Sequence, residues 1–390
     1  MTNADSALKS YYLEAVSDQL DNGTNPFLAQ IKKSSENVWG KEVKKLVIHG
    51  INGGIGAGTE DGDLPTAKGN RYAQFTSTLK NLYGTIEITD KAIRASENNS
   101  GAFVSLLNSE MDGLLKSSSF NLGRMLFGNG TGVLATVADV SESGLVILDD
   151  ARNVMEGMVV DFRNASGDIL TGCESRTVEV IDRVNKMIKV SGSTLDEEDL
   201  PFGTTVVLHG SYNNEITGLG AIFDRNVYTL YGLDKNANYW MTPYVKRNVG
   251  NITEAAMQRA IDAVEEASGN APDMIITSWG VRRALLNVFS ANKRYLDSVE
   301  LASGFKAISY NGIPVVVDRF CPKGTMYMLN TKDFTLHQLC DWQWLADDDG
   351  KVLRQIPGKP VYTATLVKYA ELMCSRPYAQ GALTDINEAD

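Results

Sequence analysis

The stretch from Gly50 to Gly69 constrains the fold of this 390-residue chain more than any other segment. It holds seven glycines, one proline and few apolar residues, so it is too flexible to pack as a core element. An apolar, β-branched pattern precedes it at 43–49, and extended patterns follow at 73–79 and 83–89. The alternation at 83–89 predicts a strand that runs back beside the first one. We therefore predict an extended two-stranded arm over 43–89 that carries a long mobile loop.

Such an arm has nothing of its own on which to pack. A lone hairpin is marginally stable at best in water, because the surface that it buries does not offset the entropy lost on ordering. The arm must therefore pack on another molecule. A neighbouring copy of the same chain is the natural partner.

A long helix is predicted from Gly101 to Phe127, with the sequence GNGTG ending it. At about 1.5 Å per residue this helix would span roughly 40 Å. A second, modest amphipathic pattern at 6–20 predicts a terminal helix that resembles an arm. The apolar stripe of the long helix consists of Phe103, Leu107, Met111, Leu114, Leu115, Leu122, Met125 and Leu126.

The segment from Leu134 to Glu215 differs from the rest of the chain in charge and in pattern. It holds fifteen acidic and six basic side chains, which is −9 of the total charge of −11 and leaves −2 elsewhere. Short extended runs separated by turn residues lie at 145–148, 158–162, 177–181, 187–190 and 205–208. Strands in succession without helices favour a small sandwich or barrel.

Mixed structure returns after Gly218. A helix is predicted to begin at Asn251, which forms a capping-box spacing with Glu254, and to end at Gly269. A buried strand at 274–277 and a helix capped by Ser278 follow it, as an αβα layer. The remainder is predicted to be β-rich, with a hairpin at 310–312, strands at 326–329 and 334–339, a turn at 349–350 and a long strand at 362–375.

Composition excludes several classes of protein. Hydrophobic residues make up 43% and charged residues 22% of the chain, as in ordinary globular proteins. No run of about 18 apolar residues and no signal-peptide pattern occurs, so we expect neither a membrane span nor secretion. The four cysteines are far apart and form no C-x-x-C pair. An acidic chain does not gain affinity by neutralising phosphates, which argues against nucleic acid as a direct ligand.

No residue pattern in the sequence indicates a catalytic, phosphate-binding or metal-binding site. The three histidines, His49, His209 and His337, lie in separate strand patterns, and structural roles suit them better than a catalytic triad. The run from Gly53 to Gly58 follows a strand but lacks the spacing of a phosphate-binding loop. Acidic clusters at 196–199 and 347–349 lack the spacing of a calcium loop. We therefore assign no catalytic, cofactor-binding or metal-binding residue.

Four segments together resemble the major capsid proteins of tailed bacteriophages, which have the Hong Kong 97-type fold. They are LYGTIEITDKAIRAS at 82–96 leading into the long helix, GLGAIFD at 218–224, PDMIITSWGVRRALLNVF at 272–289 and GIPVVVDRFCPKGTMYML at 312–329. The resemblance covers nearly the whole chain. It implies an α+β fold with an N-arm, an E-loop, a spine helix, peripheral and axial domains, and an inserted small all-β domain.

The resemblance also implies domain boundaries. The N-arm would cover 1–42, the E-loop region 43–95, and the peripheral domain with its spine helix 96–133. The inserted barrel-like domain would cover 134–215, and its charge suggests that it projects into solvent on the outer face. The axial domain would lie mainly over 216–324. Residues 325–390 would hold late axial strands and return to the peripheral domain.

On this resemblance the chain is a structural protein and not an enzyme. It would assemble with itself as hexamers and pentamers into the icosahedral head shell of a virion, in the bacterial cytoplasm. The shell would enclose double-stranded DNA without sequence-specific binding. Separate scaffolding, portal and decoration proteins are further implied partners. No cofactor is implied.

Some relatives crosslink an E-loop lysine to an asparagine, and Lys68 lies in a suitable loop, but no asparagine partner is identifiable. A non-covalent shell is therefore expected, with Lys68, Arg71, Gly53, Gly54, Gly56 and Gly58 as candidate intersubunit contacts. Three alternatives remain open. They are an encapsulin-like compartment shell, a cytoplasmic hydrolase with a site assembled in space, and a tail or decoration protein.

Overall fold

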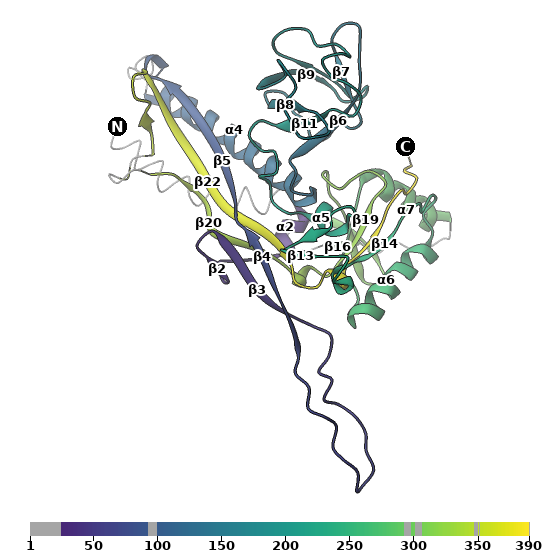
Figure 1. Cartoon of the computed structure of the whole chain (residues 1–390). Helices are drawn as coiled ribbons and strands as arrows, with labels where there is room; N and C mark the ends of the chain where they lie inside the picture. The colour runs from purple at the N-terminus through teal and green to yellow at the C-terminus, as the bar shows by residue number, and fades with distance from the viewer. Residues whose placement is uncertain are drawn as a thin grey trace.

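The computed structural model describes residues 25–92, 100–291, 298–300, 306–346, 350 and 352–389. The helix predicted at 6–20 lies outside these residues, and the turn predicted at 349–350 lies partly outside them. The described part is mixed α and β and has three parts that are distinct by eye: a long sheet with a helix along it, a small barrel, and a helix-covered sheet (Figure 1).

A two-stranded ribbon projects from the body as a long hairpin (Figure 1). Strands β3 (Glu42–His49) and β4 (Arg71–Thr78) pair antiparallel, and β2 (Val38–Trp39) pairs with β3. Residues 50–70 form no strand, as predicted. One expectation was wrong: the second arm of the ribbon is β4, and β5 (Lys80–Thr89) leaves it to pair with β22 (Val361–Cys374). The chain passes from one sheet to another at Leu79, which is buried. The alternating strand pattern therefore continues in β5, although β5 pairs with a different strand from β4.

The long sheet contains β1 (Lys32–Ser34), β20 (Phe334–Trp344), β22 and β21 (Arg354–Gln355), with β5 on β22. The short helix α2 (Pro26–Gln30) precedes it and is capped by Asn25, whose Oδ1 accepts a hydrogen bond from Leu28 N at 2.9 Å. Helix α4 (Ser100–Phe127) runs along the sheet and confirms the predicted long helix. Helix and sheet approach closely at Gly84, where an added Cβ would lie 2.8 Å from Leu114 Cδ1.

The acidic segment forms a closed barrel, which confirms the prediction of a small sandwich or barrel. The strands are β6 (Val133–Val140), β7 (Val146–Leu148), β8 (Val159–Arg163), β9 (Arg176–Asp182), β10 (Met187–Val190) and β11 (Thr205–Leu208). Five of them were predicted. The sixth, β6, follows the helix terminator directly and pairs with both β7 and β11, so it closes the barrel. The barrel has its own cluster of buried apolar side chains.

The third part is a sheet ordered β14 (Tyr244–Lys246), β23 (Gly381–Leu383), β19 (Met326–Leu329), β15 (Met274–Thr277), β18 (Ile313–Val317), β17 (Lys306–Tyr310) and β16 (Ser298–Glu300). Helices α6 (Glu254–Ser268) and α7 (Trp279–Ala291) pack on it. The predicted cap at Asn251 was wrong. Thr253 is the N-cap, because its hydroxyl accepts from Ala256 N at 3.1 Å, whereas Gly269 ends the helix in the left-handed conformation as predicted.

Short elements join these parts. Helix α5 (Leu219–Phe223) lies between the barrel and the hairpin of β12 (Thr229–Leu230) and β13 (Leu233–Asp234). Lys235 Nζ donates to the carbonyl oxygens of Ala221, Ile222 and Asp224 at 2.7, 3.0 and 3.0 Å, which satisfies the open end of α5. Burial lowers the pKa of this lysine to about 8. The 3₁₀ turns are η1 (Tyr239–Met241), η2 (Thr331–Asp333) and η3 (Pro377–Ala379).

None of the helices in the described ranges is long and apolar enough to cross a membrane.

Candidate assembly surface

The root of the β3–β4 ribbon is fixed to the body through one of its faces. Val43, Val47 and Phe75 are buried on that face. Phe75 stacks on Trp240 with ring centroids 5.8 Å apart, and His49 stacks on the same indole at 4.5 Å. Thr76 N also donates to Tyr231 O at 2.9 Å. His49 therefore has a packing role, as the sequence indicated.

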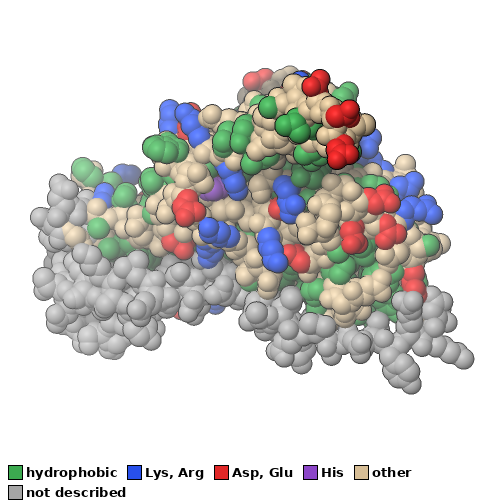
Figure 2. All heavy atoms as spheres, turned by 90° about the horizontal axis from the view of Figure 1, so that it is seen from below, with side chains coloured by type: hydrophobic (Ala, Val, Ile, Leu, Met, Phe, Trp, Pro, Cys, Tyr) green, Lys and Arg blue, Asp and Glu red, His purple; other side chains and the backbone are tan. Residues whose placement is uncertain are grey.

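The opposite face of the ribbon is apolar and uncovered. Leu46, Ile48 and Tyr72 alternate with the buried residues along β3 and β4, and each is more than half exposed. Further out, Ile51, Ile55 and Leu64 are exposed too, and Leu64 is 90% exposed. Figure 2, which views the molecule from the side to which the hairpin points, shows hydrophobic side chains at the surface between charged ones. These six residues define the ribbon patch.

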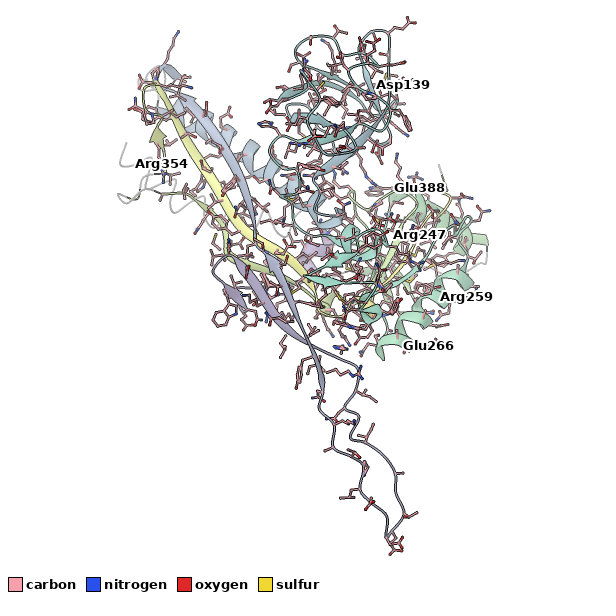
Figure 3. All side chains as sticks on the ribbon, viewed as in Figure 1. Asp139, Arg247, Arg259, Glu266, Arg354 and Glu388 are labelled. Carbon is pink, nitrogen blue, oxygen red and sulfur yellow. The ribbon has the colours of Figure 1, made fainter. Side chains whose placement is uncertain are left out.

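The ribbon patch differs from the scattered apolar side chains that most protein surfaces expose. Single exposed apolar side chains are normal, but a row of them on one projecting element indicates an interaction site. Among the residues that the structure describes, no other element stands beside the outer half of the hairpin (Figure 3). This uncovered face was not predicted, although the strand EVKKLVIH carries apolar residues on both of its alternating faces from Leu46 onward.

The structure brings the six candidate contact residues into this one ribbon. Gly53 and Gly54 lie across from Lys68, since a Cβ added to Gly53 would lie 3.4 Å from Lys68 Cγ. Arg71 stands opposite His49 at the start of β4. Gly56 and Gly58 lie across from Pro65 and Asp63 further out. The candidates are thus neighbours along the ribbon, and their contact with another subunit stays a prediction.

Two of these glycines let the arms run close together. A Cβ on Gly54 would lie 3.2 Å from the backbone nitrogen of Lys68, and one on Gly56 would lie 3.3 Å from Pro65 Cγ. Both distances are tighter than ordinary carbon contacts, so a side chain at either position would push the arms apart. Lys68 and Arg71 are exposed and make no ion pair with any residue that the structure describes.

Acidic and basic side chains lie at different places along the ribbon. Glu60, Asp61 and Asp63 make the tip acidic, whereas Lys68 and Arg71 lie nearer the body. Beside the root, Lys44 Nζ pairs with Glu42 at 3.1 Å in an exposed geometry. A contact made by this ribbon would therefore combine an apolar centre with charged ends, which is the usual composition of a protein–protein interface.

The other histidines also have structural partners. His209 Nδ1 lies 2.8 Å from Asp161 Oδ1 on the barrel, and His337 Nδ1 lies 3.1 Å from Glu36 O beside the long sheet. Burial lowers the pKa of His337. Across the described ranges, no group of three or more His, Cys, Asp or Glu side chains is placed to hold a metal ion.

No family model matches the sequence, and no curated protein matches it. Solved structures do match. The chain in the capsid asymmetric unit of cyanophage A-1(L) is 13% identical and covers 93% of each chain with a TM-score of 0.57. A chain from the capsid of a native GTA particle is 11% identical, covers 92% of this chain and 90% of that one, and has a TM-score of 0.48.

A chain from the holo-SrpI encapsulin complex of Synechococcus elongatus is 10% identical over 96% of this chain and 95% of that one, with a TM-score of 0.46. The fold assignment rests on the cyanophage structure, whose likeness extends along nearly the whole chain. The chain therefore has the fold of a phage capsid protein, as the resemblance of the four sequence segments indicated.

Proposed function

We propose that this chain is the major capsid protein of a tailed phage and builds the head shell around double-stranded DNA. The observation that carries the proposal is the β3–β4 hairpin with its uncovered ribbon patch, because a projecting element of this kind is stable and useful only against another molecule. The fold shared with the cyanophage capsid chain supports a neighbouring copy as that molecule.

The proposed domain scheme follows the sequence boundaries. Residues 1–42 are the N-arm, 43–95 the E-loop region, 96–133 the peripheral domain with α4 as its spine helix, and 216–324 mainly the axial domain. Residues 325–390 add late strands to the axial domain and return to the peripheral domain. The barrel within 134–215 is an insertion on the outer face of the shell, where its charge of −9 keeps it in solvent.

In this proposal the subunits form hexamers and pentamers of an icosahedral shell, without catalysis. Such a shell gains its strength from many modest interfaces repeated by symmetry. The glycine-rich loop suits it, because one sequence must follow the different curvatures of the two kinds of ring. Scaffolding, portal and decoration proteins are proposed as further partners in the virion, and assembly takes place in the host cytoplasm.

The test compares two charge insertions at equally exposed apolar residues. Leu64 on the ribbon is 90% exposed and Val184 on the barrel is 89% exposed, so neither Leu64→Asp nor Val184→Asp should disturb the isolated fold. Negative-stain microscopy and size-exclusion chromatography of the chain expressed alone measure assembly. We expect shells or shell fragments from the wild type and Val184→Asp, and only small species from Leu64→Asp.

Assembly that survives Leu64→Asp would remove the hairpin from the proposed interface. A compact wild-type monomer whose loop resists protease would instead favour the hydrolase alternative. An encapsulin-like shell is distinguished by its contents: particles from the native source would hold a protein cargo in place of DNA.

A further inference from the structure

Asparagine is followed by glycine at four places in the sequence, 22–23, 52–53, 129–130 and 311–312. The first of these pairs lies outside the described residues. An asparagine in such a pair can lose its side-chain amide, because glycine has no Cβ to shield the backbone nitrogen that attacks it. The three described pairs differ in how firmly the fold holds them, and this difference determines which of them can react.

The pair Asn52-Gly53 lies in the projecting hairpin just beyond β3, where residues 50–70 form no strand (Figure 1). Both residues are exposed. Asn52 Oδ1 accepts from Gly54 N at 2.8 Å, so the side-chain amide is folded over the following peptide and its carbonyl group is polarised. This contact lies within the loop itself. The backbone can therefore turn here without breaking a strand ladder.

The other two described pairs are fixed by neighbouring elements. Asn311-Gly312 is the two-residue turn between the paired strands β17 and β18, and Asn311 Nδ2 donates to Gln258 Oε1 on α6 at 2.7 Å. Asn129-Gly130 joins α4 to the barrel. Asn129 Oδ1 accepts from Thr131 Oγ1 at 2.6 Å, and Thr131 O accepts from Asn213 N at 2.9 Å. In both pairs the peptide cannot rotate toward the side chain without breaking contacts between elements.

We propose that Asn52 is a site of spontaneous modification in the unassembled chain. The backbone nitrogen of Gly53 attacks Cγ of Asn52, the Cγ–Nδ2 bond breaks, and the proton of the attacking nitrogen leaves with the amide as ammonia. Water then opens the resulting five-membered imide at either carbonyl group. One opening leaves aspartate. The other leaves isoaspartate, in which the main chain runs through the former side-chain carbon.

Both products alter the ribbon patch. Asn52 lies between Ile51 and Ile55, which are 76% and 71% exposed, so a carboxylate at this position places a charge among the apolar side chains of the patch. Isoaspartate also lengthens one arm of the hairpin by one main-chain carbon, beside the close approach of Gly54 to Lys68. If the proposed function holds, a chain that ages before assembly therefore loses its capacity to join a shell.

The first test follows the purified full chain, kept unassembled by dilution, at mildly alkaline pH. Trypsin places the three asparagines in separate peptides with one asparagine each, namely 46–68, 125–152 and 307–319. Mass spectrometry of timed samples then gives the three rates of conversion. We expect Asn52 to convert at least about tenfold faster than Asn129 or Asn311, because only its backbone turns freely. Equal rates at the three sites, or a slower rate at Asn52, would overturn the proposal.

Gly53→Ala is the matched variant for the chemical step. An added Cβ would lie 3.4 Å from Lys68 Cγ, which is an ordinary contact, so alanine fits the fold. It shields the attacking nitrogen, and we expect conversion of Asn52 to slow by about tenfold while the rate at Asn129 stays the same. An unchanged rate at Asn52 would mean that the Gly53 nitrogen is not the nucleophile.

The effect on assembly is measured by ageing wild-type and Asn52→Gln chains, each compared with its own fresh sample. Glutamine keeps the amide, but its longer side chain closes an imide ring far less readily. We expect ageing to lower the yield of shells from the wild type alone, and the shells that form to hold little converted Asn52. Shells that hold converted chains in the same proportion as the pool would overturn this effect. A fresh wild type that forms no shells contradicts the proposed function, whereas the peptide rates still decide the modification.

Discussion

Glu371 is a carboxyl group that the fold buries completely near the end of β22. Its Oε1 accepts from Thr217 N at 3.0 Å, in the chain that returns from the barrel, while its Oε2 has no partner. Burial raises the pKa of Glu371 from 4.5 to about 7. On the same strand Lys368 is fully buried as well, but it pairs with Asp341 and donates to Gln338 Oε1 at 2.9 Å.

We predict that Glu371 makes the unassembled chain less stable as the pH rises from 4.5 to about 7. The unfolded chain loses this proton first, so the stabilisation is complete below 4.5 and is lost as the pH passes the folded pKa. The full effect is about 3 kcal/mol. Denaturant unfolding across this range measures it.

Glu371→Gln keeps the acceptor for Thr217 N and cannot ionise. Its unfolding free energy should lack this pH dependence and should exceed that of the wild type above pH 7. Parallel pH curves for the two proteins would show that Glu371 is not the group responsible.

Residues of this kind could not be found from the sequence. Glu371 and Lys368 each interrupt an apolar strand pattern, and such an interruption is read as an exposed position unless the strand is known to be covered on both faces. Arg124 and Glu215 form a buried pair although 90 residues separate them, so the pairing depends on how the barrel returns to α4. Ser278, by contrast, caps α7 as predicted, because a cap is set by its own neighbours.

The positions of helices and strands could be predicted more readily than the pairing between strands. The bounds of α4 and β15 and the turn at Asn311-Gly312 followed from local apolar spacing and turn chemistry. The pairing of β5 with β22 did not, since these strands are about 280 residues apart and many apolar strands could compete for the same edge. The closure of the barrel by β6 was likewise a matter of distant pairing.

The contact between α4 and α5 should depend on Gly218. A Cβ there would lie 2.4 to 2.7 Å from the carbonyl oxygens of Met125, Leu126 and Gly128, which are backbone atoms that cannot turn aside. We expect Gly218→Ala to cost at least about 2 kcal/mol of unfolding free energy. Thermal and denaturant unfolding provide the measurement.

Gly113→Ala is the matched control within α4. An added Cβ meets nothing within 4 Å there, so alanine should stabilise the chain by about 0.5–1 kcal/mol through helix propensity. A Gly218→Ala chain as stable as the wild type would mean that α5 does not sit against the end of α4.

The barrel should fold without the rest of the chain. Its strands close on themselves, and its buried cluster draws on residues from Leu134 to Val206 alone. We predict that a fragment covering 131–214 unfolds cooperatively, as followed by circular dichroism and by dispersed amide signals in nuclear magnetic resonance. A fragment that lacks such signals would mean that the barrel needs contacts with the rest of the chain to stay folded.

At the scale of the whole molecule, the hairpin and the barrel extend from the body in opposite directions (Figure 1). Asp139 marks the barrel and Glu266 marks α6 on the other lobe in Figure 3. If the chain forms a shell through the hairpin, the two projections come to lie in different surroundings. The hairpin becomes covered by a neighbour, and the barrel stays in solvent.

Trypsin tests this difference. In the unassembled chain, cleavage after Lys68, Arg71 and Lys186 should be rapid, because all three residues are exposed. In assembled particles we expect cleavage after Lys68 and Arg71 to slow at least tenfold, while cleavage after Lys186 in the β9–β10 turn continues. Mass spectrometry of timed digests gives both rates from one sample. Equal protection of all three sites, or of none, would contradict the proposed arrangement.

The pairing of β22 has a mechanical consequence. Val361–Ala370 bond to β5 along one edge and Leu366–Cys374 bond to β20 along the other, with the hydrogen bonds directed across the strand. A pull along β22 therefore strains many of these bonds together in shear, whereas a pull across it would open them one after another. If the chain forms a shell under pressure from packed DNA, the long sheet would resist stretching along its strands. It would open at lower force when pulled across them.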